Sequence, residues 1–325
     1  MRALVTGGAG FVGSHVANSL VNAGYHVLVF DDLSSGTHEK PRVVEQRSAD
    51  VNGTSTGRVE FIEGRIQDSE AVRAAAQGID FVFHLAAVVS VPASLKSPAH
   101  CYEVNLNGSL NVLAAAKEVG ATKVVLASSA AIYGESGEPV AENAVSKPLS
   151  PYAASKSAME QAARMYYEVY GLPTVCLRYF NVYGPRQRPD SMYAAVIPAF
   201  INAMSDGKPP TIFGDGEQKR DFVYIDDVVR ANLLAAESDE AIGKVLNISG
   251  GGAVTINELA GILHEIIPEA PAPVHKPPRD GDIYFSEAVI EQAWRALGYR
   301  PEVALAEGLR STVEWFRQER LQTPP

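Results

Sequence analysis

Short apolar segments alternate with amphipathic segments along the first half of the chain. The apolar segments have the length of strands buried on both faces, as Phe81-Val82-Phe83 and Val124-Val125-Leu126 illustrate. The longer segments between them have helical periodicity. This alternation predicts an α/β fold with a doubly wound parallel sheet. The expected strands are Arg2–Thr6, His26–Phe30, Val59–Glu63, Phe81–Ala86, Lys123–Ser128 and Thr174–Phe180, and the expected helices are Ser14–Asn22, Asp68–Gln77, Pro98–Val119 and Tyr152–Tyr170.

The pattern changes after Tyr183, where proline-containing loops interrupt it and only Val245–Ile248 still has the pattern of a core strand. We therefore expect two domains. Residues 1–181, with 222–248 returning to them, form the sheet, and residues 182–325 form a smaller α/β domain that closes over its ligand edge. The expected loops are Val44–Gly57, 184–189, 208–210 and 268–278, and the expected C-terminal helices begin at a Thr255–Glu258 capping box and at Gly308.

A glycine-rich turn follows the first strand. Gly7, Gly10 and Gly13 have the spacing G-x-x-G-x-x-G between that strand and the first helix. Glycines there permit a tight turn and let backbone N–H groups and the helix N-terminus approach a pyrophosphate. Asp31 ends the second strand, where a carboxylate binds a ribose 2′-hydroxyl and repels a 2′-phosphate. This order predicts NAD as the cofactor rather than NADP. The alternative is a glycine turn with no ligand.

The clearest candidate for chemistry is the segment Ser150–Lys156, with the sequence SPYAASK. Ser150 is a favourable N-cap and Pro151 suits the first helical position, so a helix is predicted to begin here. Tyr152 and Lys156 are then one turn apart on the same face. A neighbouring ammonium lowers the pKa of a phenol and makes it a usable proton acceptor near neutral pH. The alternative is a helix with a tyrosine packed on its surface.

Composition narrows the class of protein. The chain has 325 residues, 46% of them hydrophobic, which is enough for a substantial core. Its net charge of −10 and the lack of a basic block argue against nucleic acid or an anionic membrane as a partner. No apolar run spans a bilayer and no signal peptide precedes the first strand, so a cytoplasmic protein is expected. Cys101 and Cys176 are expected to be buried thiols rather than a disulfide, and the seven histidines have no metal-binding spacing, so no metal is expected.

Together these features make the chain resemble the extended short-chain dehydrogenases/reductases, in the nucleotide-sugar epimerase branch typified by UDP-glucose 4-epimerase. The resemblance covers nearly the whole chain. It implies a Rossmann sheet that carries NAD, a smaller domain that binds the UDP-sugar, and a homodimer formed through the helices Pro98–Val119 and Tyr152–Tyr170. The matching blocks are TGGAGFVGSH near the start, FDDLSSG at Phe30–Gly36, HLAA at His84–Ala87, SSAAIYG at Ser128–Gly134, SPYAASK, LRYFNVYGPRQ at Leu177–Gln187, RDFVYIDD at Arg220–Asp227 and RDGDIYFS at Arg279–Ser286.

The resemblance implies a role for each matched residue. Ser129 and Tyr152 would hydrogen-bond the 4-oxygen of the sugar, and Lys156 would hold the nicotinamide ribose. The implied cofactor contacts are Gly7, Gly10, Phe11, Val12, Gly13, Asp31, Asp32, Leu33, Ser34, Ser35, Gly36, Ile66, Leu85, Ala86, Ala87, Val89, Asn105, Tyr152, Lys156 and Phe180. The implied substrate contacts are Ser90, Ser129, Tyr152, Asn181, Val196, Arg220, Arg279, Asp282 and Ser286.

Several of these positions have an alternative or depart from the family pattern. Arg220 and Arg279 would clamp the diphosphate, although an arginine more often forms a surface salt bridge. Asn105 would support an active-site water network. The alternative is that its side chain only hydrogen-bonds backbone groups and so joins two segments of the chain. Arg65 stands where the family usually has an aspartate at the adenine, and Val89 stands where the bacterial type has a lysine near the cofactor phosphates.

The implied reaction is 4-epimerisation of a UDP-hexose: Tyr152 takes the 4-hydroxyl proton while the C4 hydride passes to NAD, and the 4-keto sugar turns over and receives the hydride on its other face. Relatives that dehydrate or decarboxylate sugars carry acids just after the catalytic hydroxyl residue, whereas this chain has Ala130 and Ala131. The small Ser286, at the position that lines the sugar's 2-substituent, implies that UDP-N-acetylhexosamines are accepted beside UDP-glucose and UDP-galactose. The alternatives are an NAD(P)H-dependent 4-reductase, an epimerase of another sugar such as UDP-glucuronate, and a non-catalytic NAD-sensing protein.

Overall fold

A seven-stranded parallel sheet forms the centre of the larger part of the molecule. The computed structural model describes residues 1–34, 57–187, 195–279 and 283–322. The strand order β10-β6-β5-β4-β1-β2-β3 is that of a doubly wound sheet, as the sequence predicted. The strands are β1 (Arg2–Thr6), β2 (His26–Asp31), β3 (Arg58–Glu63), β4 (Phe81–His84), β5 (Lys123–Ser129), β6 (Thr174–Tyr179) and β10 (Val245–Ile248).

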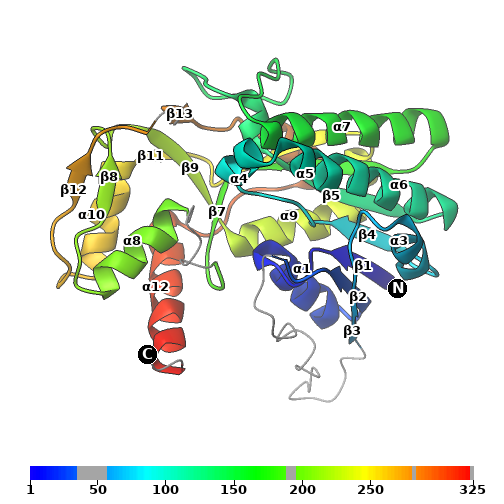
Figure 1. The fold of residues 1–325 in the computed structure, drawn as a ribbon, viewed down its shortest axis with the longest axis horizontal. Helices are drawn as coiled ribbons and strands as arrows, with labels where there is room; N and C mark the ends of the chain where they lie inside the picture. Colours follow the sequence, from blue (N-terminus) through cyan, green and yellow to red (C-terminus); the bar gives the residue numbers. More distant parts are fainter. Residues whose placement is uncertain (35–56, 188–194, 280–282, 323–325) are drawn as a thin grey trace.

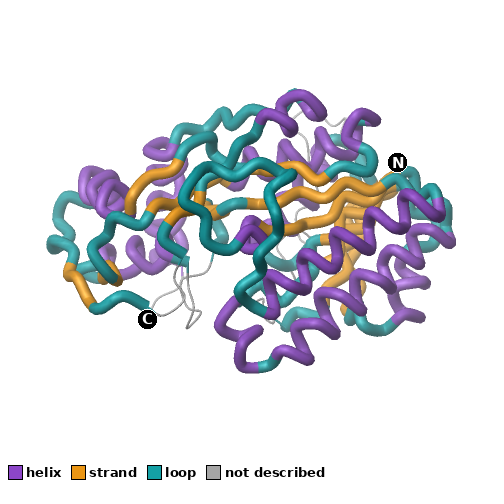
Figure 2. The backbone as a smooth tube through the Cα atoms, turned by 90° about the horizontal axis from the view of Figure 1, so that it is seen from above, coloured by secondary structure: helices purple, strands orange, loops and turns teal. Residues whose placement is uncertain are grey.

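Helices cover both faces of this sheet, and Figure 2 shows the strands side by side between them. One face packs against α1 (Phe11–Asn22) and α9 (Ile225–Glu237), around buried side chains such as Val16 and Val228. The other face packs against α3 (Ser69–Ala75), α6 (Ser109–Glu118) and α7 (Pro151–Tyr170). Because both faces are covered, the inner strands are almost wholly apolar.

The long helix expected over Pro98–Val119 is broken, and an additional helix precedes it. The chain forms α4 (Val91–Lys96), α5 (Pro98–Tyr102), a π-helical turn η1 (Glu103–Gly108) and then α6. The π turn lies where Asn105 reaches out to the backbone of Val88 and where Gly108 lies against Ile66, which a Cβ atom at residue 108 would approach to 2.6 Å. Single π turns inside helices are frequent at functional sites.

The second half of the chain builds a smaller unit that lies beside the sheet, at the left of Figure 1. Val245–Ile248 is the strand of this half that joins the large sheet, and several short strands that the sequence analysis did not place pair with one another. They are β7 (Asn181–Tyr183), β8 (Thr211–Phe213), β9 (Lys219–Tyr224), β11 (Ala253–Thr255), β12 (Val274–Lys276) and β13 (Phe285–Ser286). The helices α8 (Val196–Ser205), α10 (Ile256–Ile266), α11 (Glu291–Leu297) and α12 (Leu305–Gln322) follow the same part of the chain. Two 3₁₀ turns, η2 (Ala130–Tyr133) and η3 (Asp239–Ala241), complete the described elements.

Several local predictions can be checked directly. Thr255 and Glu258 form the predicted capping box at the start of α10. The chain does return to the large sheet through α9 and β10, although it does so from Ile225, because β9 belongs to the smaller unit. Cys101 and Cys176 are buried and unpaired, as predicted. The expected loop Val44–Gly57 lies outside the described residues except for its last member. None of the helices in the described part of the chain is long and apolar enough to cross a membrane.

Candidate active site

The carboxyl ends of the parallel strands bring together most of the residues that the sequence singled out. The chain runs outward from β1 to β2 and β3 and then returns to β4 on the other side of β1. Such a reversal opens a crevice between the two central strands, and ligands of doubly wound folds bind there. The turn after β1 borders the crevice on one side, and the segment after β4 borders it on the other.

The glycine turn is packed too closely to accept side chains. Gly7 has φ +71°, and a Cβ atom on it would lie 2.5 Å from the backbone nitrogen of Ala86. A Cβ atom on Gly13 would collide with the backbone oxygen of Gly7. Gly10 is the N-cap of α1, and no side chain caps this helix. The first N–H groups of α1 are therefore left to face the crevice, which suits a pyrophosphate.

Asp31 closes the other side of this turn. One of its carboxylate oxygens accepts a hydrogen bond from Ala9 N at 2.9 Å, and the other accepts one from Leu33 N at 2.8 Å. Burial raises the pKa of Asp31, and the two backbone hydrogen bonds oppose the rise. Leu33 adopts a left-handed conformation with φ 56°. The carboxylate is thus fixed at the end of β2, where the sequence predicted the ribose contact.

Ser129 and Tyr152 meet at the end of β5. Ser150 caps α7 by accepting a hydrogen bond from Ala153 N at 3.1 Å, and Pro151 occupies the first turn, as predicted. This start places Tyr152 beside Ser129, and their hydroxyl groups are hydrogen-bonded. The Ser129 hydroxyl also accepts the backbone N–H of Ala131 at 3.2 Å. A proton can therefore pass between the phenol and an oxygen held between these two groups.

Lys156 lies one turn further along α7 and is 3% exposed. Its ammonium donates to the carbonyl of Ala127 at 2.8 Å, and burial lowers its pKa to about 8. The expectation that Lys156 lowers the pKa of Tyr152 is wrong for this structure. Burial raises the pKa of Tyr152, because a phenolate is costly in an apolar surrounding, and the hydrogen bond with Ser129 offsets only part of the rise.

Asn105 takes the structural alternative that the sequence left open. It is fully buried, and its amide oxygen accepts Val88 N at 2.8 Å. Its amide nitrogen donates to Val88 O at 3.0 Å and to the Ser155 hydroxyl at 3.1 Å. The side chain therefore joins the segment after β4 to α7, and it positions both walls of the crevice rather than extending into it.

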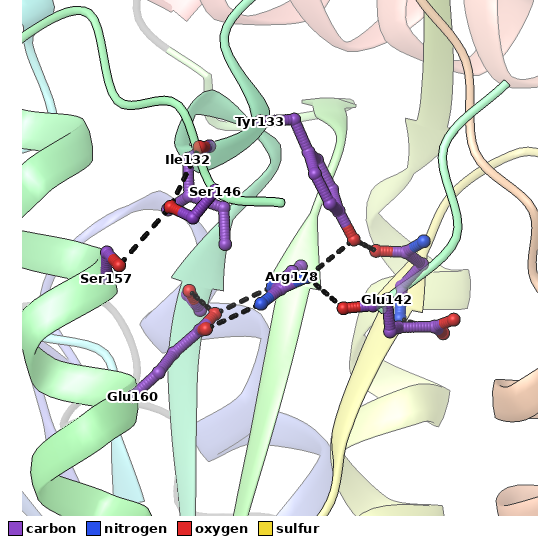
Figure 3. A network of polar contacts seen from close by, with 9 residues as sticks. Ile132, Tyr133, Glu142, Ser146, Ser157, Glu160 and Arg178 are labelled. Carbon is purple, nitrogen blue, oxygen red and sulfur yellow. Dashed lines mark hydrogen bonds and ion pairs between the residues drawn. The ribbon is translucent and has the colours of Figure 1, made fainter. Parts of the chain in front are cut away.

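A buried polar network that the sequence analysis missed joins β6 to α7 and to the turn η2 (Figure 3). Arg178 of β6 donates to both carboxylate oxygens of Glu160 of α7, at 2.9 and 2.8 Å. The Ser128 hydroxyl donates to the same carboxylate at 2.5 Å. Arg178 also donates to the Tyr133 hydroxyl at 2.7 Å. The only signal in the sequence was a glutamate one turn beyond Lys156 on α7, which does not reveal its partner on another strand.

Most other expected cofactor positions lie at the same edge. Phe11 and Val12 begin α1, Asp32 and Ser34 follow β2, and Ile66 is buried against Gly108. Leu85, Ala86 and Ala87 follow β4 and are half-buried, whereas Val89 is 67% exposed and Phe180 is buried after β6. Arg65, at the departure from the family pattern, is exposed. The predicted contacts at Ser35 and Gly36 lie outside the described residues.

The expected substrate residues come from several elements. Asn181 of β7 donates to the carbonyl of Asp221 at 2.8 Å. Arg220 lies on β9, and Ser286 of β13 is its partner in register. The Arg279 guanidinium stacks 3.7 Å above the Phe213 ring of β8. Ser90 caps α4, the half-buried Val196 begins α8, and Asp282 lies outside the described residues.

The residues present fit NAD. The cradle formed by Gly7 and Gly13 has no room for Cβ atoms and lies at the N-terminus of α1, which no side chain of the described residues caps, and Asp31 stands at the end of the next strand. Within the described ranges, no group of three or more His, Cys, Asp or Glu side chains is arranged to hold a metal ion.

The fold and the site together define a dinucleotide-binding protein with a Ser-Tyr-Lys constellation beside its cofactor crevice. The chain belongs to the NAD dependent epimerase/dehydratase family, whose model matches residues 3–249. Among curated relatives, the UDP-glucose 4-epimerase of Mycolicibacterium smegmatis is 37% identical over 322 residues, which cover 98% of this chain and 99% of that protein. A putative UDP-glucose 4-epimerase of Methanocaldococcus jannaschii is 36% identical over 317 residues, covering 97% of this chain and 98% of the relative.

Solved structures of related enzymes agree with this family membership. UDP-glucose 4-epimerase of Thermotoga maritima with UDP-glucose matches with a TM-score of 0.88 and 41% identity, covering 98% of this chain and 99% of that one. UDP-N-acetylglucosamine 4-epimerase of Methanobrevibacter ruminantium matches with a TM-score of 0.89 and 38% identity, covering 98% of each chain. UDP-glucuronic acid 4-epimerase of Bacillus cereus with UDP-glucuronic acid and NAD matches with a TM-score of 0.88 and 33% identity, covering 98% of this chain and 100% of that one. These solved nucleotide-sugar epimerases share the fold of this chain over almost its whole length.

Proposed function

We propose that this protein is an NAD-dependent 4-epimerase of UDP-hexoses. It interconverts UDP-glucose with UDP-galactose, and UDP-N-acetylglucosamine with UDP-N-acetylgalactosamine. The observation that carries the proposal is the hydrogen-bonded pair of Ser129 and Tyr152 at the same sheet edge as the glycine cradle. In this proposal, residues 1–181 together with 222–248 bind NAD, and residues 182–325 bind the UDP-sugar.

Tyr152 takes the proton of the sugar's 4-hydroxyl, and Ser129 holds the 4-oxygen. When bound, NAD supplies the acceptor and later the donor of the C4 hydride, and its positively charged ring favours the phenolate that burial disfavours. Lys156 lies on the face of α7 that carries Tyr152, so its ammonium is placed to hold the nicotinamide ribose. Tyr152 returns the proton once the 4-keto sugar presents its other face.

Epimerisation requires that the diphosphate of the substrate is bound firmly while the sugar is bound loosely. Arg220 and Arg279 are proposed to hold the diphosphate, because a guanidinium binds phosphate through paired hydrogen bonds. Asn181 donates one amide N–H to the Asp221 carbonyl, and its second amide N–H is proposed to meet the diphosphate. The hexose itself is held by few groups, so it can turn over between the two hydride transfers.

Elimination chemistry does not suit this site. Sugar dehydratases need an acid and a base near C5 and C6. The two residues that follow Ser129 are Ala130 and Ala131 of the turn η2, and their methyl groups supply neither. This argues against a dehydratase and against a decarboxylase.

Ser286 is proposed to determine which hexoses enter. It is a half-buried residue of β13, and its small side chain leaves space beside the sugar's 2-substituent. Changing Ser286→Tyr should abolish activity on UDP-N-acetylhexosamines and preserve activity on UDP-glucose. If both activities fall together, Ser286 is not the gate.

A second candidate is a UDP-glucuronate 4-epimerase, which the similarity to the Bacillus cereus enzyme favours. One experiment separates the candidates. Purified protein is incubated separately with UDP-glucose, UDP-N-acetylglucosamine and UDP-glucuronate, without reductant, and the C4 epimer is sought by NMR. Tyr152→Phe should lower the rate at least 10²-fold, because general base catalysis contributes about that much. In a separate assay with added NADH and a UDP-4-keto sugar, consumption of one NADH per sugar converted would instead identify a 4-reductase.

We also propose a homodimer formed through the helices α4 to α7. These helices carry exposed large apolar side chains, some of which a second copy of the chain would cover. They are Val91, Leu95, Tyr102, Met165, Tyr167, Val169 and Tyr170. Sedimentation should give about twice the chain mass. The two buried unpaired thiols fit a reducing compartment, so a cytoplasmic location is part of this proposal.

A further inference from the structure

The short strand β13 carries Ser286 and is held at one edge by β9. Ser286 lies opposite Arg220, and Phe285 lies opposite Lys219. The backbone N–H of Lys219 donates to the carbonyl of Tyr284 at 2.8 Å. A strand of two residues has too few ladder bonds to fix its own position, so the contacts at its other edge matter.

A carboxylate holds that other edge. Glu135 accepts a hydrogen bond from Tyr284 N at 2.8 Å on one oxygen and from Phe285 N at 3.1 Å on the other. Glu135 follows Gly134, which ends the η2 turn that begins directly after Ser129. One side chain thus joins the segment of the catalytic serine to the segment of the proposed sugar gate.

The residues after β13 are fixed by other means. Val140 donates its N–H to Glu287 O at 2.9 Å and accepts the N–H of Val289, also at 2.9 Å. Ala288 N donates to the buried carboxylate of Asp221 at 3.2 Å. These bonds do not reach Tyr284 or Phe285. Among the described residues, the start of β13 is held by β9, by Glu135 and by the Tyr284 hydroxyl, which donates to Asp215 at 3.3 Å.

We propose that Glu135 is a positioning residue for the substrate: its carboxylate fixes β13, and with it Ser286 and the register to Arg220, relative to Ser129 and Tyr152. The inference rests on the proposed function, since it assigns Ser286 and Arg220 to the UDP-sugar pocket. Two charge-assisted hydrogen bonds from successive N–H groups to one carboxylate fix the orientation of the strand as well as its distance from that carboxylate. Loss of the carboxylate frees two N–H groups to water and lets the strand shift.

The test compares Glu135→Ala with Glu138→Ala. Glu138 is an exposed glutamate of the same loop, so it controls for loss of one negative charge. Glu135→Gln keeps one acceptor oxygen and should give an intermediate result. Hydrogen exchange of the peptide that contains Tyr284 and Phe285 reports the position of the strand. Titration with UDP, and KM and kcat for whichever UDP-sugar the wild type converts, report the substrate.

For Glu135→Ala we expect exchange at Tyr284 and Phe285 at least 10-fold faster, a KM about 10-fold higher, and a kcat within 3-fold of the wild type. Glu138→Ala should change none of these. Unchanged exchange, or faster exchange with an unchanged KM and unchanged UDP affinity, overturns the proposal while leaving the proposed function intact. If the wild type converts none of the UDP-sugars, the proposed function fails. UDP affinity then decides alone: about 10-fold weaker binding in Glu135→Ala supports the role of Glu135, and unchanged binding overturns it.

Discussion

The buried ion pair of Arg178 and Glu160, which Ser128 of β5 also contacts, offers the sharpest test of how this edge of the sheet is supported. Arg178 and Glu160 are each 8% exposed in their side chains. The Glu160 carboxylate accepts two hydrogen bonds from Arg178 and one from Ser128. Replacing Arg178 with methionine preserves most of the side-chain volume but removes two of these three bonds and the compensating charge.

The expected loss of stability is large. Hydrogen bonds to a buried charge are worth about 1.5–3 kcal/mol each, so two of them sum to about 3–6 kcal/mol. Removal of one partner of a buried ion pair typically costs about 3–5 kcal/mol, which agrees. We therefore expect Arg178→Met to lower the free energy of unfolding by about 4 kcal/mol. A large part of this cost is the charge of Glu160 left uncompensated inside the protein.

The helix α7 supplies its own control. Arg164 and Glu168 form an exposed pair on the same helix at 2.7 Å, with side chains 72% and 53% exposed. Arg164→Met should cost only about 0.3–0.5 kcal/mol. The free energy of unfolding is measured by urea denaturation, followed by tryptophan fluorescence, at one fixed NAD concentration because a bound ligand also stabilises the fold.

The double variant Arg178→Met with Glu160→Met distinguishes pairing from packing. If burial of an unpaired charge is the cost, removal of the second charge should restore most of the lost stability. The reasoning is refuted if Arg178→Met is no worse than Arg164→Met. It is also refuted if the double variant loses the sum of the two single losses.

Three further outcomes follow from the structure. Gly13→Ala should abolish NAD binding in a titration, because its Cβ would collide with the backbone oxygen of Gly7, whereas Gly252→Ala, with open space around it, should bind normally. Burial raises the pKa of Asp221 to about 6, so the folded protein holds a proton that the unfolded chain loses from about pH 4. The free energy of unfolding should then fall by roughly 3 kcal/mol as the pH rises from about 4 to 6, and Asp221→Asn should remove this slope; an identical slope in both proteins would contradict it. Gly261→Ala, exposed within α10, should raise the free energy of unfolding by up to about 1 kcal/mol, and a loss of stability would count against the open space seen there.

Local chemistry predicted the elements whose partners are close in sequence. The start of α7 follows from Ser150 and Pro151, and α10 follows from its capping box, because caps are satisfied within four residues. The glycine turn was predicted for the same reason, since its spacing is a local steric requirement. The sheet order followed from the alternation of strands and helices, which leaves few topologies.

The errors arose where a distant partner decides the structure. The segment 98–119 has helical periodicity throughout, yet Asn105 bonds to Val88 and the helix widens into a π turn. The short strands of the smaller unit have little pattern of their own, and pairing across the chain makes them strands. The raised pKa of Tyr152 is likewise a result of burial, which spacing along a helix does not report.

The sequence by itself therefore determined the fold class, the cofactor cradle and the proximity of Tyr152 and Lys156, because each depends on residues a few positions apart or on a repeated pattern. Only the tertiary structure decided how Glu160 is neutralised, what Asn105 binds, and that Glu135 holds β13. These contacts join residues 17 to 150 positions apart, and the free energy of a buried or charge-assisted contact depends on a partner that no local pattern specifies.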